Sequence, residues 1–450
     1  MNDWYTALAA GLLFPLHERL KGHDTVAQRR FLETSQWWQP ARLRAHQEAR
    51  LQALLRHCQQ HVPYYRDLLA ERGLAPEAVG VADLPRLPCL TKALIRQHQD
   101  ALRADNAQSL ARFNTGGSSG EPLIFYIGKQ RVSHDVAAKW RATRWWGVDI
   151  GDPEIVLWGS PIELGAQDRL RLWRDRLLRT RLLPAFEMSA PRLDEFLALI
   201  RRQRPRMLFG YPSAFSHLAR HARARGMTMD DLGIRVVFVT SEKLYDEQRS
   251  LIEATFGCPV ANGYGGRDAG FIAHQCPAGG MHISAEDIIV EIVDAEGRAL
   301  APGQAGEIVV THLATGEFPF IRYRVGDVGM LAEAGCACGR GLPLLQEIQG
   351  RTTDFVMAMD GTVMHGLALI YVLRDLPGVD GFKIVQERLD LTRVLLRTGP
   401  EAPTDLEARI VEGFRARLGT GVTVQVERVE EIAAESSGKF RYVVSHVAPR

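Results

Sequence analysis

A segment rich in glycine and hydroxyl residues has the composition most suggestive of chemistry. Residues 113–122 are Phe-Asn-Thr-Gly-Gly-Ser-Ser-Gly-Glu-Pro, with three glycines and three hydroxyl residues in six positions. Glycine lets a loop present successive backbone N–H groups, and the hydroxyls of Thr115, Ser118 and Ser119 add donors, a combination suited to a polyphosphate. A flexible surface loop could have the same composition. A kinase-type P-loop fits poorly because the Gly-Lys-Ser/Thr ending is absent.

Two other loops carry residues of the metal-ligating type. Cys276 and His282 are six positions apart in a Pro-Gly-rich segment, and Cys336 and Cys338 form a tight pair further on. Three thiolates and one imidazole make a complete tetrahedral set for structural Zn²⁺, which leaves no position for a catalytic water. His274 could replace His282, and reduced thiols without a metal are the alternative.

The composition restricts the class of partner. The 450 residues predict two or three domains. Because 55 basic residues balance 53 acidic ones, the formal charge is only +2, and no strong field for nucleic acid or an anionic membrane is expected. Small molecules or other proteins are the expected partners.

The start of the chain is apolar but lacks the features of a targeting signal. The segment 7–16 has no basic region before it, and Leu12, Leu13, Leu16 and Leu20 continue among charged residues as in a short amphipathic helix. No later segment approaches the roughly 20 apolar residues of a membrane span. A cytoplasmic location is therefore expected.

The elements that must position these groups follow from the apolar pattern. Residues 42–73 have helical spacing, and Thr91 can cap the next helix, so the chain has a helical start over about 1–110. Short apolar runs then alternate with helical stretches, as in an α/β architecture. The runs predicted as strands are 154–158, 207–209, 236–239, 288–293 and 308–311.

A second pattern begins after Gly350. We expect a strand at 355–359, a turn at Asp360-Gly361, a helix near 367–374 and strands at 381–385 and 391–396. The predicted organisation is a large domain over 1–350 and a small α+β domain over 351–450.

An ordered set of seven motifs resembles the acyl-adenylate-forming superfamily, in the form found in the phenylacetate-CoA ligase group and the CapK-like capsule-biosynthesis proteins. The phosphate loop Thr115-Gly-Gly-Ser-Ser-Gly-Glu-Pro122 is the first. The others are Gly210-Tyr-Pro-Ser213, Thr240-Ser-Glu-Lys-Leu-Tyr-Asp-Glu-Gln-Arg249, Tyr264-Gly-Gly-Arg-Asp268, Arg322-Tyr-Arg-Val-Gly-Asp327, Gly350-Arg-Thr-Thr-Asp354 and Ser437-Gly-Lys-Phe-Arg441. The resemblance covers the chain from about Leu51 onward.

The resemblance implies a large multi-sheet α/β adenylate-forming domain with a smaller, mobile α+β C-terminal domain. It also implies that ATP and a carboxylic acid give acyl-AMP and pyrophosphate. The implied ATP-binding residues of the phosphate loop are Thr115, Gly116, Gly117, Ser118, Ser119 and Gly120. Lys439 would then be the catalytic residue, stabilising charge on the α-phosphate after the small domain closes.

Single residues acquire expected roles by the same resemblance. Asp327 would accept hydrogen bonds from the ribose hydroxyls, and Tyr264 would lie against the adenine. Asp268 would help to hold Mg²⁺, although the family usually has glutamate there. Arg351 would contact ribose or phosphate, and Asp354 would be the hinge.

The acid and the acceptor stay open at this stage. Tyr211 and Gly265 are the expected acyl-pocket residues, because ligand sites place apolar walls beside glycine-rich backbone. CoA is the simplest acceptor and a possible co-substrate, while an amine or a carrier-protein thiol is an alternative. A non-catalytic, zinc-stabilised nucleotide-binding protein is a further alternative, and a homodimer is possible.

Overall fold

The chain is described here by a computed structural model. The described residues are 4–114, 123–158, 169–185, 187–349, 355–374, 376–399, 402–430, 432 and 443–447. Among them, no helix combines the length and the apolar character needed to cross a membrane.

Helices dominate the first part of the chain, as the spacing of its leucines predicts. They are α1 (Trp4–Leu8), the π-helical turn η1 (Ala9–Leu13), α2 (Phe14–Leu20), α3 (Thr25–Ser35), α4 (Pro40–His61), α5 (Pro63–Glu71), the 3-10 turn η3 (Val81–Arg86) and α6 (Lys92–Gln97). The predicted cap of α6 is confirmed, since Thr91 Oγ1 accepts a hydrogen bond from the Leu94 N–H at 3.2 Å. The strands β1 (Ala111–Asn114) and β2 (Ile124–Ile127) follow as an antiparallel pair.

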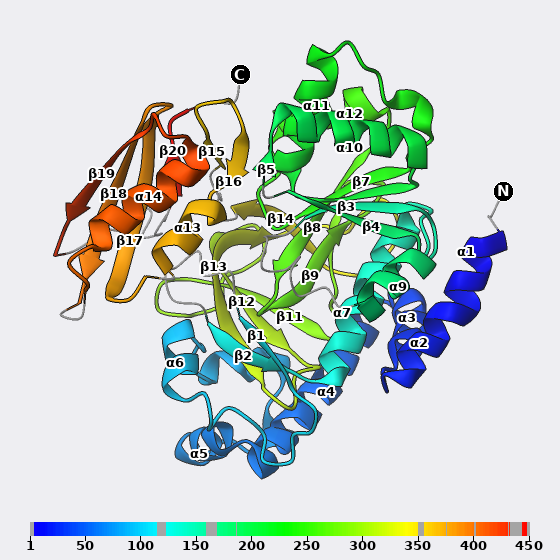
Figure 1. Ribbon diagram of the computed structural model, residues 1–450. Coiled ribbons are helices and arrows are strands. Elements are labelled where there is room, and N and C mark those ends of the chain that lie inside the picture. Colours follow the sequence, from blue (N-terminus) through cyan, green and yellow to red (C-terminus); the bar gives the residue numbers. More distant parts are fainter. Residues whose placement is uncertain are drawn as a thin grey trace.

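An 11-stranded sheet is the centre of the molecule (Figure 1). Its spatial order is β11-β12-β13-β14-β10-β9-β8-β7-β6-β3-β4. The strands are β3 (Glu154–Trp158), β4 (Thr180–Pro184), β6 (Met207–Gly210), β7 (Val236–Thr240), β8 (Val260–Gly266), β9 (Gly270–Gln275), β10 (Met281–Ile283), β11 (Ile288–Val293), β12 (Ala305–His312), β13 (Phe320–Leu331) and β14 (Leu344–Gln349). The run from β4 to β8 is parallel and the remainder is antiparallel.

Helices cover both faces of the parallel part. Leu208 of β6 and Val237 of β7 pack in a core with the helices α10 (Ala190–Gln203), α11 (Pro212–Ala224) and α12 (Asp246–Phe256). Phe209 and Phe238, one residue further along the same strands, pack on the opposite side near α7 (Lys129–Trp145). This alternation is the expected result of the two-residue strand period, and it confirms the predicted α/β class.

The end of the chain forms a smaller sheet of order β19-β18-β17-β20. Its elements are α13 (Leu367–Arg374), β17 (Val379–Arg388), β18 (Leu391–Thr398), α14 (Leu406–Leu418), β19 (Thr423–Arg428) and β20 (Val443–Ser445). The two helices share one apolar core with this sheet. A further small sheet joins β15 (Phe355–Met357) and β16 (Val363–His365) to β5 (Glu187–Met188), so a strand from the first part of the chain pairs with the last part.

Candidate active site

The carboxyl ends of the parallel strands define one edge of the large sheet. Because β3, β6, β7 and β8 run in the same direction, the residues after them meet at this edge, where ligands bind in open α/β sheets. Trp158 ends β3, Tyr211 follows β6, Glu242 follows β7 and Tyr264 lies near the end of β8. We call this place the strand-end site.

An aromatic wall forms one side of the strand-end site. The rings of Trp158 and Tyr211 are stacked with centroids 4.3 Å apart and an angle of 17°, and Phe209 stacks on Trp158 at 5.9 Å. The Lys139 ammonium lies 3.9 Å from the centroid of the Phe209 ring. Trp158 and Tyr211 are only partly buried. The predicted acyl-pocket residue Tyr211 therefore presents a flat apolar surface beside the strand ends.

A hydrogen bond joins two of the predicted nucleotide-binding residues. The Tyr264 hydroxyl donates to Asp327 Oδ2 at 3.0 Å, although β8 and β13 are separated in the sheet by β9, β10 and β14. The turn after Tyr264 requires glycine at Gly265, because a Cβ there would collide with the Gly270 carbonyl oxygen. The backbone thus brings an aromatic ring and a carboxylate to one place.

Asp268 is held in place by contacts from both sides. Tyr323, which is fully buried, donates its hydroxyl to Asp268 Oδ2 at 2.6 Å, and the Ala269 N–H donates to Oδ1 at 3.1 Å. Arg131 donates to the carbonyl oxygens of Arg267 and Asp268 at 3.1 and 3.0 Å. A single oriented carboxylate suits Mg²⁺ that takes most of its other ligands from phosphate and water.

A buried network that the sequence interpretation missed supports the same turn. Arg131 Nε donates to Asp135 Oδ2 at 2.9 Å, and Asp135 Oδ1 lies 3.3 Å from His134 Nδ1 and 3.6 Å from His312 Nε2. A Cβ on Gly270 would meet the His312 ring and Asp135 at about 3 Å. The i,i+4 spacing of Arg131 and Asp135 was a visible signal, but such pairs usually lie on the surface.

The charges of this network are fixed by their surroundings. Burial alone would raise the pKa of Asp135, yet Arg131 and hydrogen bonds from His134 and His312 hold that pKa well below its usual range. Burial, reinforced by Arg131, lowers the pKa of His312 to about 3. At neutral pH the network therefore contains a carboxylate and a neutral His312 ring.

The last part of the chain approaches the strand-end site through α13. Desolvation lowers the pKa of Arg267, and the nearby Tyr371 of α13 opposes that shift. Lys439, Arg351 and Asp354 lie outside the described residues. The phosphate-loop residues Thr115, Gly116, Gly117, Ser118, Ser119 and Gly120 also lie outside them, although the pairing of Asn114 with Ile124 joins the two strands on either side.

The four predicted zinc ligands are brought together. The Sγ atoms of Cys276, Cys336 and Cys338 and a ring nitrogen of His282 all lie within 4.8 Å of one another. Cys276 Sγ is 3.6 Å from Cys336 Sγ, and Cys338 Sγ is 3.2 Å from His282 Nε2. His274 is not in this group and packs against Phe271 instead. We call these four residues the Cys/His cluster.

The surroundings of the Cys/His cluster hold it firmly in place. The Trp145 ring lies edge-on to His282 at 5.6 Å, and the Arg340 guanidinium stacks over Trp145 at 4.5 Å. Trp145 and Arg340 both donate to Gln36 Oε1, at 2.8 and 3.1 Å. The loop needs glycine at Gly280, where a Cβ would come within 2.7 Å of Cys336 Sγ.

The thiols of the Cys/His cluster have unlike acidities. Burial raises the pKa of Cys276 to about 11. Burial would also raise the pKa of Cys338, but hydrogen bonds from Arg340 and the other two thiols hold it below its usual value. Burial lowers the pKa of His282 to about 4, which keeps the ring neutral. A neutral imidazole beside an acidic thiol is a donor set that fits Zn²⁺.

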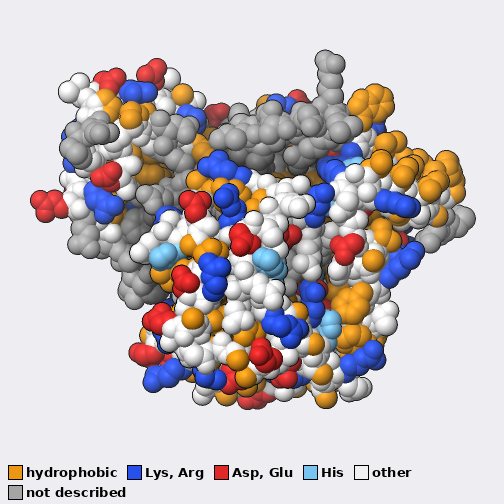
Figure 2. All heavy atoms as spheres, turned by 90° about the horizontal axis from the view of Figure 1, so that it is seen from below, with side chains coloured by type: hydrophobic (Ala, Val, Ile, Leu, Met, Phe, Trp, Pro, Cys, Tyr) orange, Lys and Arg blue, Asp and Glu red, His pale blue; other side chains and the backbone are white. Residues whose placement is uncertain are grey.

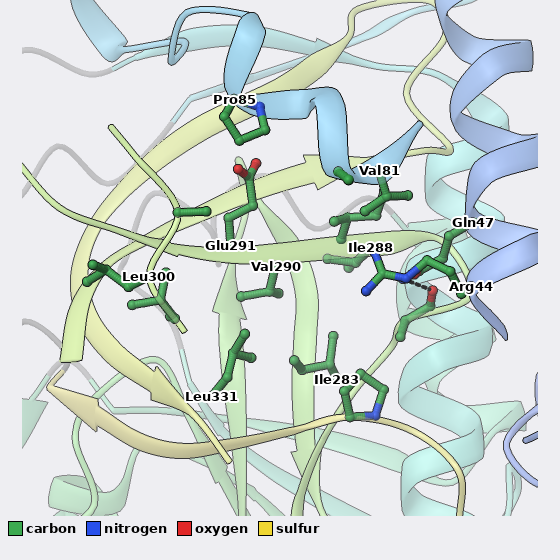
Figure 3. Close-up of a pocket in the computed structure, with 16 residues that line it drawn as sticks. Arg44, Gln47, Val81, Pro85, Ile283, Ile288, Val290, Glu291, Leu300 and Leu331 are labelled. Carbon is green, nitrogen blue, oxygen red and sulfur yellow. Dashed lines mark hydrogen bonds between the residues drawn. The ribbon is translucent and has the colours of Figure 1, made fainter. Parts of the chain in front are cut away.

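A cavity of about 250 Å³ lies elsewhere, between α4, η3 and β11 (Figure 3). Its wall is largely aliphatic, with Arg44 and Gln47 at one side and Glu291 at another. The Glu291 carboxylate already binds the Arg322 guanidinium at 3.0 and 3.1 Å. This cavity shares no residue with the strand-end site, so we assign it no part in the chemistry.

Comparison with known families matches two parts of the chain. Residues 180–315 match the family described as AMP-binding enzyme, and residues 356–446 match the CapK C-terminal domain. The first match contains β6, β7 and β8, and the second contains the smaller sheet of the last part.

Individual relatives extend along most of the chain. Protein CapK of Staphylococcus aureus is 23% identical over 405 residues, covering 89% of each chain. A phenylacetate-coenzyme A ligase of Thermus thermophilus is 26% identical over 402 residues, covering 85% of this chain and 84% of the relative. Among solved structures, 2-hydroxyisobutyryl-CoA ligase in complex with 2-HIB-AMP and CoA has the same fold, with a TM-score of 0.64, 23% identity and 90% of each chain covered.

These matches agree with the geometry of the strand-end site. Along the chain, the strands of the large sheet come first and the smaller C-terminal sheet follows, as the order of the motifs predicts. The chain thus carries an AMP-binding enzyme domain followed by a CapK C-terminal domain, and its homologues include CapK and the phenylacetate-coenzyme A ligases.

Proposed function

We propose that this enzyme activates a carboxylic acid with ATP and then transfers the acyl group, most simply to CoA. The observation that carries the proposal is a pair of hydrogen bonds near the carboxyl ends of the parallel strands, Tyr264 to Asp327 and Tyr323 to Asp268, in a chain that matches the AMP-binding enzymes over residues 180–315. In the first step a carboxylate oxygen attacks the α-phosphorus of ATP, and the bond to pyrophosphate breaks. In the second step a thiol attacks the carbonyl carbon, and AMP leaves.

The residues of the strand-end site have separate roles in this proposal. Asp327 accepts hydrogen bonds from the ribose hydroxyls, and its contact with Tyr264 keeps that ring in position against the adenine. Asp268 would hold Mg²⁺, which would neutralise charge at the phosphates when bound. Tyr211 with Trp158 forms the wall of the acyl pocket, and Gly265 contributes backbone to the same pocket.

The residues outside the described part complete the proposal. The loop 115–120 holds the phosphates, and Arg351 contacts the ribose or a phosphate. Lys439 stabilises the negative charge that develops on the α-phosphate. We propose that residues 351–450 move as a lid about Asp354, against the large domain over 1–350.

The Cys/His cluster has a structural role in the proposal. Its four side chains would fill a tetrahedral Zn²⁺ site, which leaves no position for water. The metal would fasten the loop at 276–280 to the loop at 336–341, next to Gln36 of the N-terminal part. The metal would stabilise the fold and would take no part in the reaction of the carboxylic acid.

A second acceptor is favoured by one observation. The last part of the chain matches the CapK C-terminal domain, and in this proposal it is the part that faces the acceptor. Transfer to an amine or to a carrier-protein thiol is therefore the second candidate. It uses the same adenylation step.

Pyrophosphate release is the measurement that tests the function. The protein is assayed with ATP and Mg²⁺ against a panel that includes phenylacetate, 2-hydroxyisobutyrate, benzoates, fatty acids and amino acids, each with and without CoA. Release with one acid, with a thioester when CoA is present, is the expected result. Release without a thioester would assign the second candidate. Silence across the panel together with tight ATP binding would favour a non-catalytic nucleotide-binding protein and contradict the proposal.

A further inference from the structure

The N-terminal helices turn a stripe of leucines away from the protein. Leu8, Leu12, Leu16 and Leu20 are exposed at intervals of four residues along α1, η1 and α2, and Leu20 is 80% exposed. The same helices bury Ala9 and Phe14 instead. Four-residue spacing keeps the leucines near one face, so the stripe contributes little to the core of this chain. Figure 2 shows hydrophobic side chains gathered at the edge where Figure 1 places these helices.

The helix α9 (Arg169–Leu177) extends this apolar surface. Leu172, Trp173 and Leu177 are exposed, with Trp173 at 63%. The Tyr5 hydroxyl donates to the Leu177 carbonyl at 2.8 Å, and the Arg179 guanidinium lies 4.3 Å from the Tyr5 ring. Residues 4–20 and 172–181 therefore form one continuous surface, which we call the N-terminal apolar face.

The charge on this face is positive. Arg176 and Arg181 are exposed on it and Arg174 and Arg179 are half-buried, while Asp175 is the only acidic residue between 172 and 181 and pairs with Arg174. The other end has exposed arginine and lysine at positions 19 and 21. Glu18 offers no compensation at the surface, because it is buried and accepts a hydrogen bond from Thr25. A chain with a net charge of only +2 thus gathers cations around an apolar stripe.

We propose that the N-terminal apolar face docks this enzyme on an anionic lipid surface. Leucines insert at the boundary of the acyl chains, tryptophans lie at the level of the headgroups, and arginines bind lipid phosphates. Trp4, which is 75% exposed, and Trp173 are placed at the apolar face for this arrangement. The inference concerns binding alone and does not depend on the proposed reaction.

A second copy of the chain fits the face less well. A two-fold interface places the same patch on both partners, so the positively charged surface around Arg176 would meet an equally charged surface. Like charges in contact oppose such an association, whereas an anionic bilayer complements them.

Co-sedimentation with vesicles tests the proposal. We expect at least about tenfold more binding to vesicles that contain phosphatidylglycerol than to pure phosphatidylcholine at low salt, and loss of most of that binding at high salt. Arg176→Glu should weaken binding by about tenfold. Arg72→Glu, an exposed charge reversal at the end of α5, should not. Equal binding to both vesicle types, or equal loss in both variants, would overturn the proposal.

Two further measurements test whether the face inserts into the bilayer and whether it binds a second copy of the chain. Brominated lipids should quench the fluorescence of the native chain, and Trp4→Phe with Trp173→Phe should remove most of that quenching. Unchanged quenching would show that the face does not insert. Sedimentation velocity should show that the free native protein is a monomer. If it shows a dimer, the double variant Leu12→Ser with Leu16→Ser tests whether this face holds the dimer together. Such a dimer would assign the face to a second copy instead.

Discussion

The strand-end site and the Cys/His cluster bring together distant residues for opposite purposes. Tyr264, Asp268 and Asp327 are partly exposed, and two of them contact each other from strands that are not neighbours. In the cluster, Cys276 and His282 are buried, and all four side chains converge on one point. We propose that the first arrangement binds a ligand that enters and leaves, whereas the second would hold one zinc ion with all four of its side chains. The two proposed roles therefore differ, one being reactive and the other structural.

The largest effect is expected at the reactive site. Lys439→Ala should lower the rate of acyl-AMP formation by about 10²–10³-fold, because one donor to the developing charge is lost. ATP affinity should change little, since the phosphate loop remains. Single-turnover pyrophosphate release and ATP titration measure the two quantities. Lys383→Ala, in β17, is the matched control, and normal acyl-AMP formation by the Lys439 variant would remove this lysine from the mechanism.

The cluster should respond to a different measurement. Elemental analysis should find about one zinc per chain. Cys336→Ser removes a direct ligand, so zinc affinity should fall by more than the roughly 10–100-fold loss typical of residues that only hydrogen-bond to a ligand. Cys89→Ser removes a partly buried thiol outside the cluster and should keep the metal. The thermal midpoint should fall only in the first variant. A stable, metal-free native protein would contradict the structural assignment.

Local patterns predicted much of the fold. The strands at 154–158, 236–239 and 288–293 and the cap at Thr91 follow from alternation, apolar runs and capping chemistry within a few residues, and all are confirmed. Pairing between distant segments was not predictable in this way. The pairing of β16 with β5 joins residues far apart in the chain, and no pattern within either strand specifies its partner.

In the candidate site, too, local motifs identified some residues, whereas others depend on packing between distant elements. The cysteine spacings and the motif around Tyr264 named residues that the structure brings together. No sequence pattern indicates that Tyr323 donates to Asp268, because a tyrosine inside an apolar strand usually packs in the core. The network of Arg131, Asp135 and His312 was missed for a similar reason, since burial decides its role and burial depends on packing between elements.

Removing the buried support of Asp268 should sharpen the contrast between the two regions. Tyr323→Phe deletes a hydrogen bond to a carboxylate, and such bonds contribute about 1.5–3 kcal/mol. We expect kcat/KM for ATP to fall by about tenfold and the Mg²⁺ concentration for half-maximal activity to rise. Zinc content should not change. Tyr126→Phe is the control, because it removes a tyrosine hydroxyl elsewhere. An unaltered Mg²⁺ dependence in Tyr323→Phe would show that Asp268 does not bind Mg²⁺.

The smallest effect is a dependence of stability on acidity. The pKa of His312 is lowered to about 3 and that of His217 to about 4, in both cases chiefly by burial, while an unfolded histidine titrates near 6.5. Between these values the unfolded chain binds more protons, so stability rises with pH and is lost as pH falls below about 6.5. From pH 7 to 5 the loss should be about 2 kcal/mol for His312 and less for the partly exposed His217.

Urea midpoints measured at pH 7 and pH 5 test this dependence. His217→Gln should reduce the shift between the two midpoints, because one group that resists protonation is removed. His61→Gln, which changes a partly exposed ring paired with Asp105, should leave the shift close to that of the native chain. Equal shifts in both variants would mean that the acid sensitivity arises elsewhere. The Cys/His cluster also contains a histidine, so the measurement is made with zinc in excess. Any remaining acid sensitivity then belongs to other parts of the core.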